Sequence, residues 1–312
     1  MGTYCFGIDV GGTTVKCGLF RTDGTLVEKW EIPTRKENNG DQILPDVAAA
    51  VNAKMEEKGI SKEEVEGVGI GVPGPVNSKG EVSCAVNLFW GYKNVVGEME
   101  ELTGLHAEAG NDANVAALGE AWKGAAAGSS DVIMVTLGTG VGGGIIINGK
   151  ILTGENGAGG EIGHMCVNLE ETDTCGCGGH GCLEQYASAT GISRLARKKM
   201  EHETRATILT KEDLSAKAVF DAVKEGDEVA IEVATEMGNY LGHAMADMAA
   251  VLDPAVFVIG GGVSKAGEVL LSFIEKPFME KAFFANKNVK FKLATLGNDA
   301  GICGAAKLVL ED

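Results

Sequence analysis

Hydrophobic and polar positions alternate along the first thirty residues, in three runs separated by turns. The runs are "TYCFGIDV", "VKCGLF" and "TLVEKWEI", and the turns are "GGTT" and "RTDG". A period of two is typical of a strand that buries one face. We therefore expect three antiparallel strands joined by two tight turns.

Helical spacing follows in several segments. Residues 41–59 form an apolar-periodic run that ends at Gly59, a residue suited to closing a helix. Residues 65–76 read as a buried strand that runs into a Pro/Gly turn, and a short strand at 106–112 precedes a helix at 113–124. Residues 228–254 are predicted to form the longest helix. Its apolar face comprises Val229, Val233, Met237, Leu241, Met245, Met248 and Leu252.

The opening pattern returns in the middle of the chain. Residues 131–152, "DVIMVTLGTGVGGGIIINGKIL", repeat the order of apolar strand, glycine turn and apolar strand, and end in an Asn148-Gly149 hairpin. A third apolar strand and glycine turn lie in "AVFVIGGGVS". Strands and helices alternate without low-complexity linkers, which predicts an α/β protein of two related halves.

Composition narrows the function classes. The chain has 312 residues and a formal net charge of −17, which disfavours binding to nucleic acid or to an anionic membrane. The N-terminal residues show no basic segment followed by an apolar run, and no stretch reaches the roughly 20 apolar residues of a membrane span. We expect a cytoplasmic protein, in which thiols stay reduced.

Three of the eight cysteines stand close together in "CGCGGHGCLE". Cys175, Cys177 and Cys182, together with His164, would make a closed Cys3His zinc site of the structural kind. His180 is a competing fourth ligand, although it is crowded between two of the cysteines. Free thiols or a redox switch are the alternatives to zinc.

Two glutamates flank the cysteine cluster. Glu161 precedes His164 by three residues, and Glu184 follows Cys182 by two. A metal would fix both carboxylates, whereas each alone is more typical of a solvated surface group.

Glycine turns are the other candidate binding elements, because successive backbone N–H groups can surround a phosphate. A single turn of this kind is more often a plain hairpin, but two related turns could hold a polyphosphate. Asp9, just before the first turn, could hold Mg²⁺. The turn residues are Gly11, Gly12, Thr13, Thr14, Gly138, Thr139, Gly140, Gly261 and Gly262.

Asn111 and Asp112 lie where the short strand is expected to meet a helix. Either could simply cap that helix. A carboxylate there could also accept the proton of an attacking hydroxyl during phosphoryl transfer.

The ordered set of motifs resembles the ROK family of sugar kinases and repressors, from residue 7 to about residue 305, and within it most closely the bacterial ATP-dependent glucokinases. The motifs are "GIDVGGTTVKCGLF", "GVPGPV", "NLFWGY", "GNDANVAALGE", "LGTGVGGGIIINGKIL", "GAGGEIGH", "CGCGGHGCLE" and "VIGGGVS".

This resemblance implies an actin/hexokinase-like, ribonuclease H-like duplicated fold with two lobes and a central cleft. Residues 1–115 would form a small lobe onto which a C-terminal helix at about 300–312 packs, and residues 116–299 a large lobe with the zinc loop. ATP, Mg²⁺ and structural Zn²⁺ are the implied cofactors, and a homodimer or larger homo-oligomer is the implied assembly.

The resemblance also assigns roles. Asp112 would be the catalytic base. The implied sugar-binding residues are Asn87, Asn111, Asp112, Glu161, His164 and Glu184. The implied zinc ligands are His164, Cys175, Cys177 and Cys182, so His164 would use one ring nitrogen for the metal and the other for the sugar.

The implied activity is transfer of the γ-phosphate of ATP to the 6-hydroxyl of glucose. Mannose, N-acetylglucosamine, N-acetylmannosamine and fructose are alternative acceptors, and polyphosphate is an alternative donor. A sugar-sensing repressor is the alternative of another class. We expect it less, because the first glycine motif begins at Gly7 and leaves no room for a DNA-binding domain before it.

Overall fold

The computed structural model describes residues 2–310, and it divides into two compact units. Unit 1 comprises the chain up to Ser130, the segment Gly144–Gly160 and the chain from Thr295 onward. Unit 2 comprises Asp131–Gly143 and Glu161–Ala294. The prediction of lobes at 1–115 and 116–299 stays a prediction; the units have other bounds, because helix α4 (Asp112–Lys123) runs through residue 115 within unit 1.

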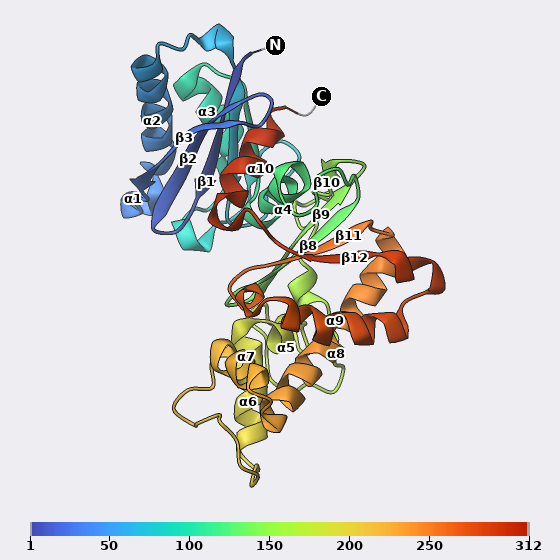
Figure 1. The fold of residues 1–312 in the computed structure, drawn as a ribbon. Helices are drawn as coiled ribbons and strands as arrows, with labels where there is room; N and C mark the ends of the chain where they lie inside the picture. Colours follow the sequence, from blue (N-terminus) through green and yellow to red (C-terminus); the bar gives the residue numbers. More distant parts are fainter. Residues whose placement is uncertain (1, 311–312) are drawn as a thin grey trace. The chain divides into compact units, whose positions relative to one another are not determined.

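Unit 1 is built on a five-stranded sheet of order β3-β2-β1-β4-β7 (Figure 1). Strands β1, β2 and β3 are antiparallel neighbours, whereas β4 pairs parallel with both β1 and β7. The three-stranded meander predicted from the opening alternation is therefore confirmed. The strands are β1 (Tyr4–Val10), β2 (Thr14–Arg21), β3 (Leu26–Pro33), β4 (Val65–Val72) and β7 (Ala107–Asn111), and a small separate ladder pairs β5 (Glu81–Val82) with β6 (Lys93–Asn94).

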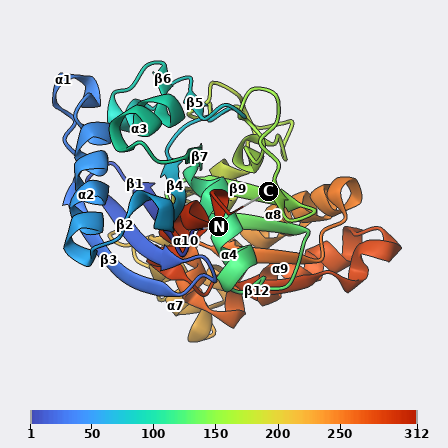
Figure 2. The ribbon, with the colours of Figure 1, turned by 90° about the horizontal axis from the view of Figure 1, so that it is seen from above.

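Helices cover both faces of this sheet (Figure 2). On one face α2 (Ile43–Lys58) and α3 (Val95–Thr103) bury their apolar side chains against Phe6 and Ile8 in the main core of the unit. On the other face α10 (Ala300–Leu308) packs against β1, β4 and α4. A short helical turn, α1 (Glu37–Gly40), precedes α2.

Backbone packs directly on backbone where α10 meets the sheet. A Cβ on Gly69 of β4 would lie 1.7 Å from the Ala305 carbonyl oxygen, and a Cβ on Gly304 would lie 1.7 Å from that of Val115 in α4. Only glycine allows so close an approach. The C-terminal helix is thus fixed against both the sheet and α4.

The second sheet has the order β10-β9-β8-β11-β12. Its strands are β8 (Val132–Leu137), β9 (Val141–Ile147), β10 (Lys150–Ile151), β11 (Val256–Gly260) and β12 (Lys290–Leu293). β11 is parallel to both β8 and β12. The predicted turn after β9 is confirmed, because Asn148 and Gly149 both have positive φ, of 53° and 80°.

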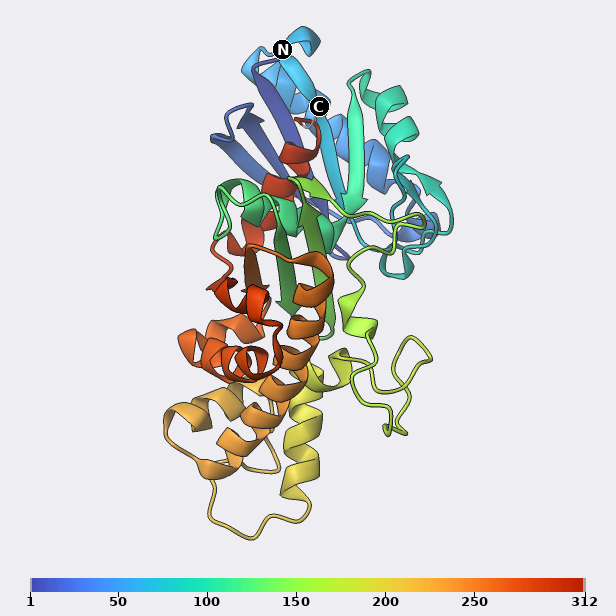
Figure 3. The same cartoon turned by 90° about the vertical axis from the view of Figure 1, so that its right-hand side faces the viewer.

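Helices of unit 2 pack around the long α8 (Glu228–Leu252), which ends two residues before the predicted bound at residue 254, with Asp253 as its C-cap. In Figure 3 the yellow α6 (Ala189–Met200) lies alongside the orange α8. The others are α5 (Glu184–Ala187), α7 (Ala216–Lys224) and α9 (Glu268–Lys281). The predicted apolar face of α8 is buried from Val229 to Met248, which confirms that part of the predicted face, whereas Leu252 is half-buried. Within residues 2–310 no helix combines the length and the apolar character that a membrane span requires.

A buried glutamate holds two loop segments of unit 1 together. Glu120 of α4 has no solvent exposure, and its carboxylate accepts hydrogen bonds from the backbone N–H groups of Ala125, Thr295 and Leu296 at 2.7, 3.0 and 2.8 Å. The last two N–H groups lie on the segment that leads into α10. Removing the acceptor would leave buried donors without partners.

We predict that Glu120→Gln lowers the free energy of unfolding by about 2–3 kcal/mol, because the amide NH2 would face backbone donors where the carboxylate accepted from them. Glu101→Gln, at an exposed position of α3, is the matched control and should change it by less than about 0.5 kcal/mol. Urea denaturation followed by circular dichroism measures both. Equal stability of the two variants would contradict this account of Glu120.

Candidate active site and metal centre

The first glycine turn lies between β1 and β2 in unit 1. The Gly11 N–H donates to the Thr14 carbonyl oxygen at 3.0 Å, which closes the turn. Asp9 pairs across the ladder with Lys16, whose Nζ lies 3.8 Å from Asp9 Oδ2. Burial raises the pKa of Asp9, and the Lys16 charge acts against that rise. The sequence therefore places a carboxylate and a cation directly beside the turn.

Asn87 stands next to the same turn. It is an exposed residue of the 3-10 helix Val86–Leu88, and its carbonyl oxygen lies 3.9 Å from the position that a Cβ on Gly12 would occupy. Trp90 anchors this segment, because its indole N–H donates to the Gly40 carbonyl oxygen at 3.1 Å. The structure thus brings Asn87 to the first turn from a distant part of the sequence.

Asn111 and Asp112 occupy the predicted junction between β7 and α4. Asn111 caps the helix: its Oδ1 accepts from the backbone N–H groups of Ala113 and Asn114, and its Nδ2 donates to the Gly74 carbonyl oxygen at 3.0 Å. Asp112 is exposed in the first turn of α4. The two readings of this pair are compatible, since the cap is made by Asn111 and the neighbouring carboxylate projects from the helix start, where the helix dipole favours a negative charge.

The second and third glycine turns lie together in unit 2. The Gly138 N–H donates to the Gly140 carbonyl oxygen at 3.0 Å, with the exposed Thr139 between them. Gly261 has φ +83°, and a Cβ on it would lie 2.5 Å from the Leu137 carbonyl oxygen at the end of β8. The turn that contains Gly261 and Gly262 therefore packs against the strand that leads into the second turn.

Glu184 links the second turn to the cysteine cluster. A Cβ on Gly140 would lie 2.6 Å from Glu184 Oε2, so the carboxylate occupies the space that a side chain there would need. The other oxygen, Oε1, accepts from Cys175 Sγ at 3.0 Å and lies 3.8 Å from His164 Nδ1. One glutamate at the start of α5 thus contacts both predicted elements.

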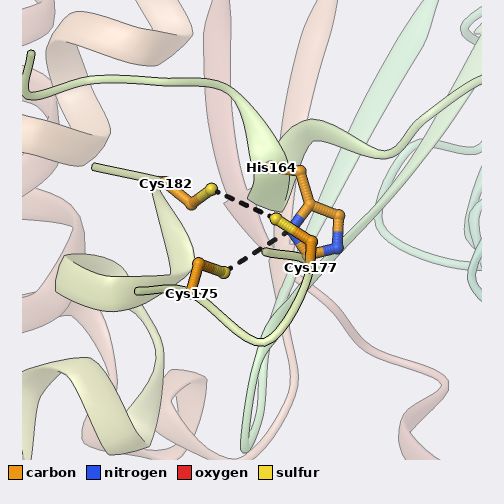
Figure 4. Close-up of side chains that lie close together, drawn as sticks. All are labelled: His164, Cys175, Cys177 and Cys182. Carbon is orange, nitrogen blue, oxygen red and sulfur yellow. Dashed lines mark hydrogen bonds between the residues drawn. The ribbon is translucent and has the colours of Figure 1, made fainter. Parts of the chain in front are cut away.

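The four predicted zinc ligands come together in unit 2 (Figure 4). The ligand atoms of His164, Cys175, Cys177 and Cys182 all lie within 4.8 Å of one another. His180 is not part of this group; it pairs with Thr174 in a short bridge of the intervening loop. Of the two predicted fourth ligands, the structure favours His164.

The spacing of these donor atoms fits a tetrahedral metal. Zinc bonds to sulfur of about 2.3 Å give tetrahedral edges of about 3.8 Å. Cys177 Sγ and Cys182 Sγ are 3.6 Å apart, and Cys175 Sγ and His164 Nδ1 are 3.9 Å apart. The donor set, three thiols and one imidazole, is one that zinc prefers.

The two nitrogens of His164 face different groups. Nδ1 lies toward Cys175, whereas Nε2 lies 4.0 Å from Glu161 Oε2. Glu161 directly precedes the short 3-10 helix Ile162–His164. The side chains of Glu161 and His164 are both exposed. An imidazole held by a metal at Nδ1 would therefore present Nε2 beside the Glu161 carboxylate.

Sequence reasoning missed the residues that anchor the cysteine loop. Arg194 of α6 forms ion pairs with Glu171 and with Asp173, the latter at 2.6 Å. Burial alone would raise the pKa of Glu171, but hydrogen bonds from Tyr186 and Arg194 outweigh it and lower the pKa to about 2. No local pattern signals these contacts, because the partners are separated by 15 to 23 positions.

Two cavities of unit 2 adjoin the glycine turns. One, of about 400 Å³, is lined by Thr139, Gly140, Cys175, Glu184 and Arg194 among others. The other, of about 340 Å³, is lined by Gly262, Val263, Phe220 and Ala189 among others, and its walls are mainly apolar. The second cavity thus offers mainly apolar walls beside the third turn, with charged residues also in its lining (Lys217, Asp221, Lys224 and Lys265).

Known proteins are similar to this chain in sequence and in fold over nearly their whole lengths. A glucokinase of Halalkalibacterium halodurans is 44% identical over 98% of this chain and 94% of its own, and one of Thermotoga maritima is 34% identical over 98% of this chain and 96% of its own. The crystal structure of a ROK family glucokinase from Streptomyces griseus in complex with glucose and AMPPNP matches with a TM-score of 0.74 and 35% identity, over 98% of both chains.

These similarities confirm the predicted actin/hexokinase-like fold class and the resemblance read from the motifs. The sequence profile described as "ROK family" matches residues 5–312. The chain therefore belongs to the ROK family.

Proposed function

We propose that this protein is a glucokinase, which transfers the γ-phosphate of ATP to the 6-hydroxyl of glucose and releases glucose 6-phosphate and ADP. The observation that carries the proposal is the 44% identity to a glucokinase over 98% of the chain. The Streptomyces griseus structure, in complex with glucose and AMPPNP, supports the same acceptor and a nucleotide donor.

Asp112 is the proposed catalytic base. It is exposed at the start of α4, where the Ala113 N–H donates to its Oδ1 at 2.8 Å and limits its orientation. As the bond to phosphorus forms, the 6-hydroxyl must lose its proton, and a carboxylate within hydrogen-bond reach accepts it. Asn111 acts beside it as a sugar-binding residue and, through its cap, holds the helix start in place.

The remaining sugar contacts are assigned to Asn87, Glu161, His164 and Glu184. A hexose presents several hydroxyl groups, and recognition requires fixed acceptors and donors. Glu184 Oε2 packs against Gly140, and His164 presents Nε2 beside Glu161. The enzyme would distinguish hexoses that differ at one hydroxyl by contacts worth about 1–3 kcal/mol each.

Phosphate binding is assigned to the glycine turns at Gly11–Thr14 and Gly138–Gly140, whose backbone N–H groups suit a polyphosphate. Asp9 is the proposed carboxylate contact to Mg²⁺; contacts of this kind are often made through a water molecule. When bound, Mg²⁺ would neutralise part of the charge of the phosphates. The apolar cavity beside Gly262 suits a nucleoside, since Phe220, Val263 and Ala266 line it.

Zinc at His164, Cys175, Cys177 and Cys182 is proposed to be structural. Four protein ligands leave no position for a reacting water, so the metal would supply rigidity rather than chemistry. The loop that it would fix carries His164 and leads into Glu184. A cytoplasmic location and a homo-oligomer, a homodimer or larger, remain predictions.

We predict that Asp112→Asn lowers the turnover of glucose by at least about a hundredfold, because the amide cannot accept the proton. Glucose affinity, measured by isothermal titration calorimetry, should change by less than about threefold, because the amide oxygen still accepts a hydrogen bond. Coupled measurement of ADP release gives the turnover.

Asp299→Asn is the matched control for that variant. Asp299 also stands at a helix start of unit 1, before α10, and its carboxylate pairs with Lys29 at 2.7 Å rather than serving in any proposed contact to substrate. Its turnover should stay within about twofold of the parent protein. Retention of most of the turnover by Asp112→Asn would refute the assignment of the base.

We predict about one zinc per chain in protein purified without chelator, measured by inductively coupled plasma mass spectrometry. Cys175→Ser should lower that content and the melting temperature together, because metal binding contributes to folding free energy. Cys84→Ser, at an exposed cysteine of unit 1, should change neither. Folded, active protein that contains no zinc would contradict the metal assignment.

A further inference from the structure

A fourth cysteine, Cys166, lies next to the four proposed zinc ligands but is not one of them. Cys166 is exposed, and it stands directly opposite the buried Cys182 in an antiparallel bridge. Cys182 is one of the four clustered residues, whereas Cys166 is not. Its Sγ instead lies 3.8 Å from the Asn168 carbonyl oxygen.

The register of this bridge places the two thiols for a cross-strand bond. The Val167 N–H donates to the Gly181 carbonyl oxygen at 2.8 Å, and the Leu183 N–H donates to that of Met165 at 2.9 Å. These two backbone hydrogen bonds flank the cysteines. Cys166 and Cys182 therefore form a non-hydrogen-bonded pair of the antiparallel ladder. Such pairs have Cα atoms about 4.5 Å apart and side chains on one face of the ladder.

That separation lies within the range of about 4.4–6.8 Å that a disulfide requires. The bridge is also held closely together, since a Cβ on Gly181 would lie 1.9 Å from the Asn168 carbonyl oxygen. A bond between Cys166 and Cys182 would therefore need little movement of the backbone.

We propose that Cys166 is an oxidation site, and that its disulfide to Cys182 withdraws one sulfur from the metal cluster. The proposal rests on the zinc assignment given above. A peroxide is the class of oxidant. Cys166 reacts first because it is exposed and is outside the ligand set.

The chemistry balances in two steps. The Cys166 sulfur attacks one oxygen of hydrogen peroxide, becomes a sulfenic acid and releases one water. The Cys182 sulfur, which carries no proton as a metal ligand, then attacks the Cys166 sulfur; the S–S bond forms, and the expelled hydroxide takes a proton from solvent to give a second water. One thiol, one thiolate, one peroxide and one proton thus give one disulfide and two waters, and a dithiol reductant reverses the change.

Cys177 is the competing partner for Cys182, because their sulfurs are 3.6 Å apart and Cys177 is also exposed. Both of these sulfurs, however, serve the same metal in the proposed site. Oxidation at Cys177 would begin at a sulfur that the proposed metal already holds, and a bond to Cys182 would remove two ligands at once. Oxidation at Cys166 begins at a sulfur outside the ligand set and removes one ligand.

The test treats zinc-loaded protein with hydrogen peroxide. It follows zinc release with a chromogenic chelator, free thiols by titration, and the cross-linked peptides by mass spectrometry. We expect the loss of two thiols per chain, a Cys166–Cys182 peptide, and zinc release that a dithiol and added zinc reverse. Cys166→Ser should slow the release at least about tenfold, with zinc content and glucose turnover unchanged before treatment.

Cys84→Ser is the matched control, because it removes the other exposed cysteine outside the cluster and should release zinc as fast as the parent protein. Cys166→Ala provides a second variant if the serine disturbs folding. Three results would each overturn the proposal. They are equal zinc release from the parent and both variants at Cys166, a Cys177–Cys182 peptide in place of the expected one, and parent protein that keeps all its thiols. The peptide map and thiol count do not depend on zinc, so a failed zinc assignment would be recognised separately.

Discussion

The carboxylate of Glu184 is the contact on which the proposed chemistry of unit 2 depends. One oxygen packs against Gly140 of the second glycine turn, and the other lies 3.0 Å from Cys175 Sγ and 3.8 Å from His164 Nδ1. One side chain therefore lies between a backbone turn suited to phosphate and a cluster suited to zinc. Displacing Glu184 would disturb both elements at once, and this links the metal proposal to the kinase proposal.

The loop that carries Cys175 and Cys177 lacks an apolar core of its own. It is rich in glycine and exposed at most positions between Thr172 and His180. Ion pairs from Arg194 to Glu171 and Asp173 fix its approach, and the ladder at Cys166 and Cys182 closes it. A metal at the cluster would supply the remaining constraint, in place of the apolar core that a segment of this composition lacks. The close fourth thiol would make that constraint sensitive to oxidation.

Much of the fold could be predicted because its signals are local. Alternation predicted β1 to β3, Gly59 marked a helix end, and Asn148-Gly149 marked a hairpin. The cysteine spacing likewise named a cluster that the structure assembles. These features depend on residues a few positions apart, so the sequence carries them directly.

What could not be predicted depends on partners distant in sequence. Glu120 resembles a surface residue of a helix, yet it is fully buried by the segment at Thr295 and Leu296. Arg194 has no pattern that points to Glu171, and the pairing of Cys166 with Cys182 follows from a register that only the folded loop sets. The roles of Asp112 and the sugar-binding residues came from family resemblance, because an exposed carboxylate after a helix cap has no chemistry that sequence pattern alone identifies.

The most direct test of the central claim is a comparison of initial rates of ADP release with Mg·ATP and a panel of sugars. The panel comprises glucose, mannose, fructose, N-acetylglucosamine and N-acetylmannosamine, and the protein is loaded with zinc beforehand. We predict turnover with glucose as the strongly preferred acceptor. No turnover with any of these sugars would contradict the proposal of an ATP-dependent hexose kinase, and preference for another sugar would contradict the assignment of glucose while leaving phosphoryl transfer in place.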